Sequence, residues 1–396
     1  MAIQASIGLS AEKDPVSAAK EAVLQARRNL RAEKIDLAIT FGSVDLFSAG
    51  LVKTLGVYLA DTPIIGCSST AIISSQGIYK RGLAVMLLSF PEGVYFNTAC
   101  LRELGAKMPQ AAGEELGEKL LYGFSGIRRD LGIMFSDGLM RENAKLIYGL
   151  QERLGSSFPF VGASASDNLR FSKSYLYFNH DIFSNAACGV LLGGKLNFGL
   201  GTKHGWQPLG KPRRVTRSKD NIVYEIGGVS AVNFYEEYFG YSLSKLRREL
   251  KLISVLYPIG IYLPGEEEYL LRNILSIEND GSLVFQGDVP EESEIRLMIG
   301  TKESALEAAR QALEEAKKSL SGSQVNLVLI LDSISRYLLL GRDADKELDV
   351  IREGLEQDTP LIGLYTYGEQ APLTAINYRG KAYFHNQTIS ILAIGS

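Results

Sequence analysis

One sequence pattern occurs three times along the chain and constrains its fold more than any other feature. Each copy contains an apolar strand, a helix, a Pro-x-x-Gly turn that leads into a second short strand, and a closing apolar strand. The three turns span residues 63–66, 159–162 and 360–363. Three copies of similar length predict one structural unit that is used three times.

The turn itself predicts where polar side chains gather. Proline fixes φ as the chain enters the strand, and glycine lets the backbone turn closely against a neighbouring group. Small polar residues follow each glycine, at residues 67–70, at Ser164 and Ser166, and at Tyr365 and Thr366. We expect these three strand ends to converge, although the same turns could also do no more than end buried strands.

Composition excludes several classes of protein. The 42 Lys and Arg residues nearly balance the 45 Asp and Glu residues, for a net charge of −3, which argues against a nucleic-acid partner. The apolar runs are far shorter than the roughly 20 residues that span a bilayer, so no membrane association is expected. Three widely separated cysteines and an N-terminus without signal-peptide character favour a reduced, cytoplasmic protein.

Signals for metals and cofactors are weak. Only three histidines occur and none lies beside a cysteine, so no metal site is expected. The glycines of residues 199–205 have G-x-G-x-x-x-G spacing with no helix predicted after them, which does not fit a dinucleotide-binding loop. We therefore expect no cofactor.

A region of different character separates the second and third copies. Its predicted elements are short strands and two helices between residues 207 and 299, with an Asn-Asp-Gly hairpin turn at residues 279–281. A Gly-Gly pair at residues 227–228 marks the predicted domain boundary. The predicted domains are therefore residues 1–228, with two copies of the unit, and residues 229–396, with the third copy and the inserted strands.

Charged and amide side chains near the strand ends are candidate ligand contacts. Arg336 follows the leading strand of the third copy, and Asn386 precedes its last strand. Glu369 lies on a glycine-bounded turn beside Tyr365 and Thr366. A zwitterionic ligand requires such a mixture, because a guanidinium binds a carboxylate and a carboxylate binds an ammonium group.

Two other functions fit parts of the sequence. A small-molecule hydrolase or transferase could use Cys67 or an acid–base site centred on Glu369, although no nucleophile elbow or base motif surrounds the cysteine. A protein-interaction scaffold is the other alternative, with the basic helix at residues 245–251 as its candidate surface.

Several short motifs occur in a characteristic order. They are Gly66-Cys-Ser-Ser-Thr70, Gly162-Ala-Ser-Ala-Ser-Asp167, Gly205-Trp-Gln-Pro-Leu-Gly210, Leu256-Tyr-Pro-Ile-Gly260, Gly363-Leu-Tyr-Thr-Tyr-Gly-Glu369 and His385-Asn-Gln-Thr388. In this order they resemble the FIST (F-box and intracellular signal transduction) family, over both its N-terminal and its C-terminal halves. The resemblance implies a sensory domain of signal transduction that binds a small ligand such as an amino acid, rather than an enzyme.

The same resemblance implies a mixed α/β (α+β) fold of two domains, with mixed sheets flanked by helices and recurring strand-helix-strand-strand units. Where members of the family typically have a cysteine at a strand end, this chain has Asp332 or Ser333, while the arginine is kept as Arg336. Because the two halves use the whole chain, the output is expected from a separate signalling protein.

We therefore predict a cytoplasmic sensor in which a bound ligand shifts the two halves and changes a partner surface. The predicted ligand-binding residues are Arg336, Tyr365, Thr366, Glu369, Asn386, Cys67, Ser68, Asp167 and Asn168. Arg336 is expected to hold an anionic group, and Glu369 a cationic or hydroxyl group.

Overall fold

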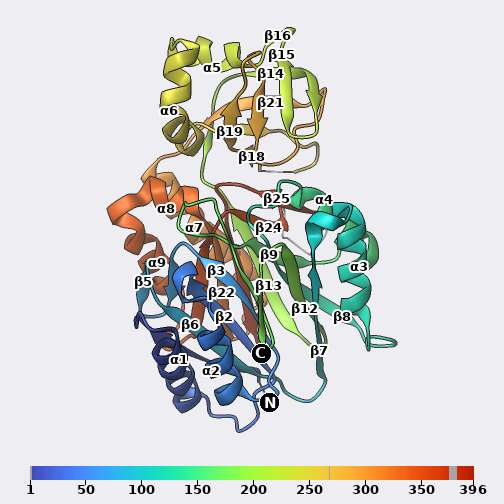
Figure 1. Ribbon diagram of the computed structural model, residues 1–396, viewed down its shortest axis with the longest axis vertical. Coiled ribbons are helices and arrows are strands. Elements are labelled where there is room, and N and C mark those ends of the chain that lie inside the picture. The colour runs from blue at the N-terminus through green and yellow to red at the C-terminus, as the bar shows by residue number, and fades with distance from the viewer. Residues whose placement is uncertain (1, 267, 374–380) are drawn as a thin grey trace.

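The protein has a large body and a smaller lobe, which forms the upper end of the molecule in Figure 1, with both termini at the opposite end. The computed structural model describes residues 2–266, 268–373 and 381–396. Within these residues the body contains three six-stranded sheets, and the lobe contains one eight-stranded sheet.

The body is built from three units whose elements follow the same order, with one extra helix in the third. The first unit contains β1 (Gln4–Ser10), α1 (Pro15–Asn29), β2 (Leu37–Ser43), α2 (Ala49–Leu59), β3 (Ile64–Ser69), β4 (Ile72–Ser74), β5 (Gly77–Tyr79) and β6 (Leu83–Ser89). The second contains β7 (Val94–Arg102), α3 (Pro109–Leu121), β8 (Arg129–Ser136), α4 (Asn143–Leu154), β9 (Phe160–Ser164), β10 (Leu176–Phe178), β11 (Asp181–Phe183) and β12 (Ala186–Gly194). The third contains β13 (Asn197–Lys203), α7 (Lys302–Ser319), β22 (Val325–Ser333), α8 (Ile334–Leu340), α9 (Ala344–Glu353), β23 (Leu361–Thr366), β24 (Gly368–Pro372), β25 (Ala382–His385) and β26 (Ile389–Gly395).

Strand pairing is the same in the three units. β2 is parallel to β3, β8 to β9 and β22 to β23. The closing strands β6, β12 and β26 run antiparallel to these leading strands, and β1, β7 and β13 pair with the closing strands. The predicted mixed α/β fold with a recurring unit is therefore confirmed.

Each sheet is completed by a hairpin from another unit. The hairpin β10–β11 of the second unit pairs with β3 of the first, and β24–β25 of the third unit pairs with β9 of the second. The hairpin β4–β5 of the first unit pairs with β23 of the third, which closes the cycle. The three sheets therefore contain strands from more than one unit each.

Each unit is longer than the sequence pattern predicted, because an outer strand and a helix precede it. In the third unit the outer strand is β13, whose glycines made it resemble a loop. A Cβ at Gly201 would lie 1.8 Å from the Ala312 carbonyl of α7, so this glycine lets the helix pack closely on the strand. The glycine-rich stretch thus serves packing.

The helices begin where capping groups satisfy free amides. Asp14 accepts a hydrogen bond from the Ser17 amide at 2.8 Å, and Pro15 occupies the first turn of α1. At α7, Thr301 and Ser304 form a reciprocal capping box. In the third unit, α8 is an additional helix directly after β22.

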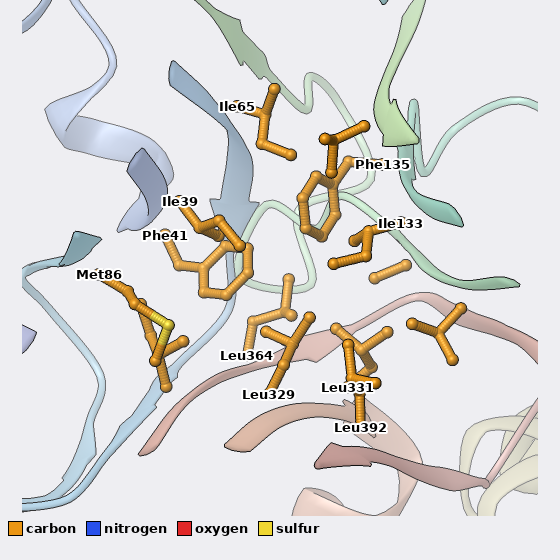
Figure 2. Packing of buried hydrophobic residues seen from close by; sticks show 14 of the residues in the cluster. Ile39, Phe41, Ile65, Met86, Ile133, Phe135, Leu329, Leu331, Leu364 and Leu392 are labelled. Carbon is orange, nitrogen blue, oxygen red and sulfur yellow. The ribbon is translucent and has the colours of Figure 1, made fainter. Parts of the chain in front are cut away.

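The main core lies where the inner faces of the three sheets meet. Figure 2 shows this packing, in which Phe41 from β2 and Phe135 from β8 meet edge to face with ring centroids 5.3 Å apart. Leu329 and Leu331 of β22 point into this core, and the intervening Ile330 packs on the other face of the sheet, with α7 and α9. This alternation follows from the two-residue period of a strand.

The lobe is inserted between β13 and α7 of the third unit. Its elements are β14 (Gln207–Lys219), β15 (Ile222–Ile226), β16 (Val229–Ser230), α5 (Val232–Phe239), α6 (Leu243–Leu256), β17 (Ile259–Ile261), β18 (Leu270–Arg272), β19 (Ile274–Ile277), β20 (Leu283–Phe285) and β21 (Glu294–Ile299). It has an apolar core of its own. The division into residues 1–228 and 229–396 stays a prediction, and residue 228 lies in the β15–β16 turn.

Among the helices of the described residues, none is both long enough and apolar enough to cross a lipid bilayer.

The central core makes a direct prediction about stability. Phe135 is fully buried between the sheets, so Phe135→Ala is expected to lower the free energy of unfolding by about 3–5 kcal/mol, because it leaves a cavity in a close-packed core. Chemical denaturation measures this loss. The control Tyr122→Ala removes a side chain that is 82% exposed and should change the free energy by about 0.5 kcal/mol or less. Equal effects of the two changes would contradict the assignment of this core.

Candidate functional site

The three polar strand ends meet in one buried, hydrogen-bonded junction. The Oγ of Ser166 accepts a hydrogen bond from the Thr70 amide at 2.7 Å and donates one to the Tyr365 carbonyl at 2.7 Å. Ser68 donates to the Ser166 carbonyl at 2.8 Å. One serine thus connects strand ends of all three units, and the predicted convergence is confirmed.

Asp167 fixes the loop that leaves this junction. Its carboxylate accepts hydrogen bonds from the amides of residues 171–173 at 2.7–2.9 Å and another from the Tyr367 hydroxyl. Burial acts to raise the pKa of Asp167, but the hydrogen bonds outweigh burial, and the pKa lies below its usual range. The next residue, Asn168, is exposed and has a left-handed backbone.

Next to the junction, a cluster of charged side chains surrounds Arg336 at the start of α8. The guanidinium Nε lies 3.0 Å from Asp332 Oδ1, and Nη2 contacts Glu347 of α9. Nη1 donates to the His204 carbonyl at 2.6 Å, and Nη2 donates to the Ala305 carbonyl at 2.7 Å. All three charged side chains are at most 2% exposed. The cation is therefore held by two internal carboxylates and two carbonyls.

Asp332 is an acid at a strand position where the other two units have no charged residue. Strand register places Asp332 opposite Tyr365, and the corresponding residues of the first and second units are Gly42 and Ser136. Burial and the neighbouring Glu347 carboxylate raise the pKa of Asp332 well above its usual range. An uncharged residue thus stands at this strand end in two units, and a buried acid in one.

Glu369 is a second acid that only the third unit carries. It pairs with β9 at the position where Leu176 pairs with β3 and Ile72 pairs with β23. All three side chains are buried. Two units therefore fill this inward position with an apolar side chain, and the third fills it with a carboxyl group.

The carboxyl group of Glu369 is only partly hydrogen-bonded. Oε2 accepts from the Thr388 amide at 3.1 Å, while Oε1 has no hydrogen-bond partner among the described residues. Burial raises the pKa of Glu369 well above its usual range, although the Thr388 amide and the charge of Arg336 oppose this effect. The protonated form is therefore favoured, and it presents one free oxygen.

The lobe covers this cluster through a few polar contacts. The amide of Asn273, between β18 and β19, donates to Asn386 Oδ1 at 3.2 Å, and its side chain donates to Ser335 at 3.4 Å. Gln286 of the lobe donates to the Tyr367 carbonyl at 2.5 Å. The cluster thus lies at the boundary between the lobe and the body.

Cys67 lies apart from the charged cluster. It is fully buried in the central apolar core, opposite Phe41 on one side and Leu176 on the other. Burial raises the pKa of its thiol, which disfavours the thiolate that a nucleophile requires. This surrounding argues against catalysis by Cys67.

The predicted residues therefore occupy four surroundings. Arg336, Tyr365, Glu369 and Asn386 lie in or beside the charged cluster, Ser68, Thr366 and Asp167 in the strand-end junction, Cys67 in the apolar core, and Asn168 on an exposed loop. Ligand contact by these residues stays a prediction.

Glu347 and Asn273 are not among the residues predicted from the sequence. Glu347 lies on the buried face of α9 beside Leu348 and Ile351. A carboxylate on an otherwise apolar helix face was the available signal. For Asn273 no sequence signal exists, because its contacts join segments more than 60 residues apart.

The described part of the chain contains no cluster of side chains that fits a metal ion. No group of three or more His, Cys, Asp or Glu side chains there is arranged to hold a metal ion.

Comparison with known proteins agrees with the fold and with the motifs. The FIST N domain matches residues 36–229, and the FIST C domain matches residues 231–372. The chain belongs to the FIST family. FIST domains are sensory domains of signal transduction.

Two relatives are uncharacterized proteins. One, from Mycobacterium tuberculosis (strain ATCC 25618 / H37Rv), is 24% identical over 390 residues, which cover 94% of this chain and 95% of the relative. The other, from Methanocaldococcus jannaschii, is 24% identical over 273 residues, which cover 65% of this chain and 51% of the relative. Among solved structures, a cyanuric acid hydrolase from A. caulinodans covers 100% of both chains with a TM-score of 0.40 and 9% identity.

The raised pKa of Glu369 predicts how the stability of this FIST protein depends on pH. In the unfolded chain an ordinary glutamate has a pKa of about 4.3. The stabilising contribution of protonated Glu369 is fully present below that pH and is lost as the pH rises toward the higher folded pKa. Glu369→Gln imitates the protonated acid, so it should be more stable than the wild type by about 1 kcal/mol or more near pH 8, and less so near pH 4.

Urea unfolding at the two pH values measures this difference. The exposed Glu353→Gln is the control, and its effect should be the same at both. A Glu369→Gln effect that does not grow with pH would contradict the buried, protonated state.

Proposed function

We propose that this FIST protein is a cytoplasmic sensor that binds a small metabolite, such as an amino acid, and passes the bound state to a separate signalling protein. The observation that carries the proposal is the charged cluster of the third unit. The positions equivalent to Asp332 and Glu369 in the other two units hold uncharged residues, and those units form sheets with the same strand pairing. The fold itself therefore does not require these charges.

The energetic cost of the cluster supports a functional role. Asp332, Glu347 and Glu369 place three carboxyl groups near one guanidinium, all at most 2% exposed. Buried ion pairs often contribute no more stability than apolar side chains of similar size, because both charges lose their hydration. A buried group with an unfilled hydrogen bond, such as Glu369 Oε1, costs further free energy. A ligand that supplies the missing partners would recover part of this cost.

The chemistry of the cluster suits a zwitterionic ligand. In this proposal a ligand carboxylate competes for Arg336, while an ammonium or hydroxyl group bonds to Glu369 Oε1. Asn386 and Tyr365 lie beside these groups and would fix the orientation. Because the side chains of the cluster are at most 2% exposed, binding requires that the lobe move away from the strand ends.

This requirement supplies the proposed signal. Asn273 donates two hydrogen bonds from the lobe to the cluster region, and Gln286 donates one. A ligand that replaces such contacts binds one lobe position better than the other and shifts the population toward it. The exposed surface near the boundary then differs between the two states, and a partner protein can detect the difference.

Acid–base chemistry at Glu369 is the second candidate function. A carboxyl group with a raised pKa in a closed polar cluster has the property that a general acid requires. Chemical change of a bound compound, rather than its unchanged release, would favour this alternative.

A ligand screen tests the proposed sensor. The full chain is heated with single amino acids and small metabolites. A true ligand raises Tm, and its stabilising free energy grows with the logarithm of its concentration, to about 2.7 kcal/mol at 100 times its Kd. Glu369→Gln should abolish or strongly reduce the shift for a ligand with an ammonium group, because a bound cation favours the ionised carboxylate and glutamine cannot ionise. The exposed Glu353→Gln should keep it. Failure of every compound, or a shift that survives in Glu369→Gln, would contradict the proposed site.

A further inference from the structure

A separate cavity of about 280 Å³ lies where three parts of the chain meet. Its walls come from α4 of the second unit, from β17 and β18 of the lobe, and from the start of β25 in the third unit. In Figure 1, β18 lies at the lower end of the lobe, and α4 and β25 lie just below it. None of the charged residues of the strand-end cluster lines this cavity.

Arg272 of β18 is the buried cation of this cavity. It is 3% exposed, and its Nε donates to the Asp288 carbonyl at 3.0 Å. Its Nη1 donates to the carbonyls of Leu271 and Phe384, both at 2.9 Å. No hydrogen bond from Nη2 is present within the described residues. A guanidinium has five N–H donors, so this one retains donors for a further acceptor.

The charge of Arg272 is not neutralised by a close carboxylate. No carboxylate oxygen of the described residues lies within 4.0 Å of its nitrogens, in contrast to Arg336, which contacts two. Asp288 is the nearby acid, and burial raises its pKa, which favours its neutral form. Lys381 also lines the cavity, while Lys145, another lining residue, is ion-paired with Glu142 at 2.7 Å and Asp220 at 3.0 Å. The electrostatic surroundings therefore favour an anion.

The site around the guanidinium is shaped for it. A Cβ at Gly287 would lie 2.9 Å from Arg272 Nε, so a larger residue there would displace the side chain. The remaining walls are mostly apolar, with Ile147 from the body and Ile261 and Leu270 from the lobe. The cavity thus combines one oriented cation with apolar surface, which is the usual composition of a small-molecule site.

The equivalent position in the first unit lacks this construction. There a groove lies between α2 and the hairpin β10–β11, just as the cavity lies between α4 and the hairpin β24–β25. Its lining residues all come from the first and second units, and it contains no arginine. The lobe therefore adds a further wall to one of these equivalent grooves, which supplies Arg272 and the apolar strands β17 and β18.

We propose that this cavity binds a small carboxylic acid with an apolar body, whose carboxylate forms an ion pair with Arg272 while its body lies against Ile147, Ile261 and Leu270. The inference goes beyond the proposed sensor, because it assigns a second site made of other residues. The two sites are connected through the chain, since Asn273 directly follows Arg272 and hydrogen-bonds to Asn386 and Ser335.

Three matched probes test the recognition of the anion in the full chain. Hexanoate, hexanol and hexylamine share the same apolar body and differ in the head group. Calorimetric titration should detect hexanoate, with hexanol and hexylamine about 10-fold weaker or more, because a charge-assisted hydrogen bond is lost. Equal binding of the three probes, or no binding of hexanoate by the folded wild type, would overturn the proposal.

Two variants locate the site. Arg272→Gln removes the cation and should weaken hexanoate about 10-fold or more while hexanol is unchanged. Ala144→Phe fills the cavity from α4 without removing a charge, so it provides the test if Arg272→Gln does not fold. The control Ala49→Phe adds the same ring to the equivalent groove of the first unit and should leave hexanoate binding unchanged. Binding that survives Ala144→Phe would overturn the proposal.

Glu369→Gln separates this inference from the proposed sensor. If the cavity is an independent site, hexanoate binds Glu369→Gln and the wild type with the same affinity. Loss of hexanoate binding in Glu369→Gln, with retention in Ala144→Phe, would place the anion in the strand-end cluster and overturn the cavity site. A failed metabolite screen together with normal hexanoate binding would contradict the sensor proposal alone.

Discussion

The exchange of hairpins between units is the interaction on which the rest of the structure depends. Each second parallel strand, β3, β9 or β23, would have a free edge if its unit folded alone, and the hairpin of another unit pairs with that edge. Backbone groups along a buried, unpaired edge would lack hydrogen-bond partners, which is costly. The three units therefore complete their sheets only together, and the same exchange brings the three Pro-x-x-Gly strand ends to one point.

This near-symmetry makes the departures of the third unit interpretable. In a domain without repeated units, a buried acid such as Glu369 cannot be compared with an equivalent position in the same chain. Here the equivalent backbone position holds Leu176 in the second unit and Ile72 in the first. The comparison separates what the fold needs from what the third unit adds. The additions are the acids Asp332 and Glu369, in the same unit whose residues Asn386, Ser335 and Tyr367 hydrogen-bond to the lobe.

Local patterns made part of this structure predictable from the sequence. The Pro-x-x-Gly turns, the apolar strands and the polar strand ends are short motifs, and Arg336 and Glu369 could be singled out because each stands beside such a motif. The pairing of hairpins could not be predicted, because it joins segments far apart in the chain. β13 could not be predicted as a strand because it is rich in glycine, and these glycines are needed for the close contact with α7. Arg272 had no signal either, because its surroundings come from distant segments.

The position of the lobe explains why the charged cluster and the cavity occur at one boundary. The lobe is inserted between β13 and α7, so both of its covalent connections enter the third unit. Its strands β17 and β18 also face α4 of the second unit across the cavity. One short segment, Arg272 with Asn273, contributes to both places. A ligand that moves Arg272 would also move the adjacent backbone of Asn273. Asn273 is hydrogen-bonded to Asn386 and to Ser335, the residue before Arg336. Coupling between the two places then requires only that each ligand prefer one position of this segment, because a difference in affinity between two positions is what shifts their populations.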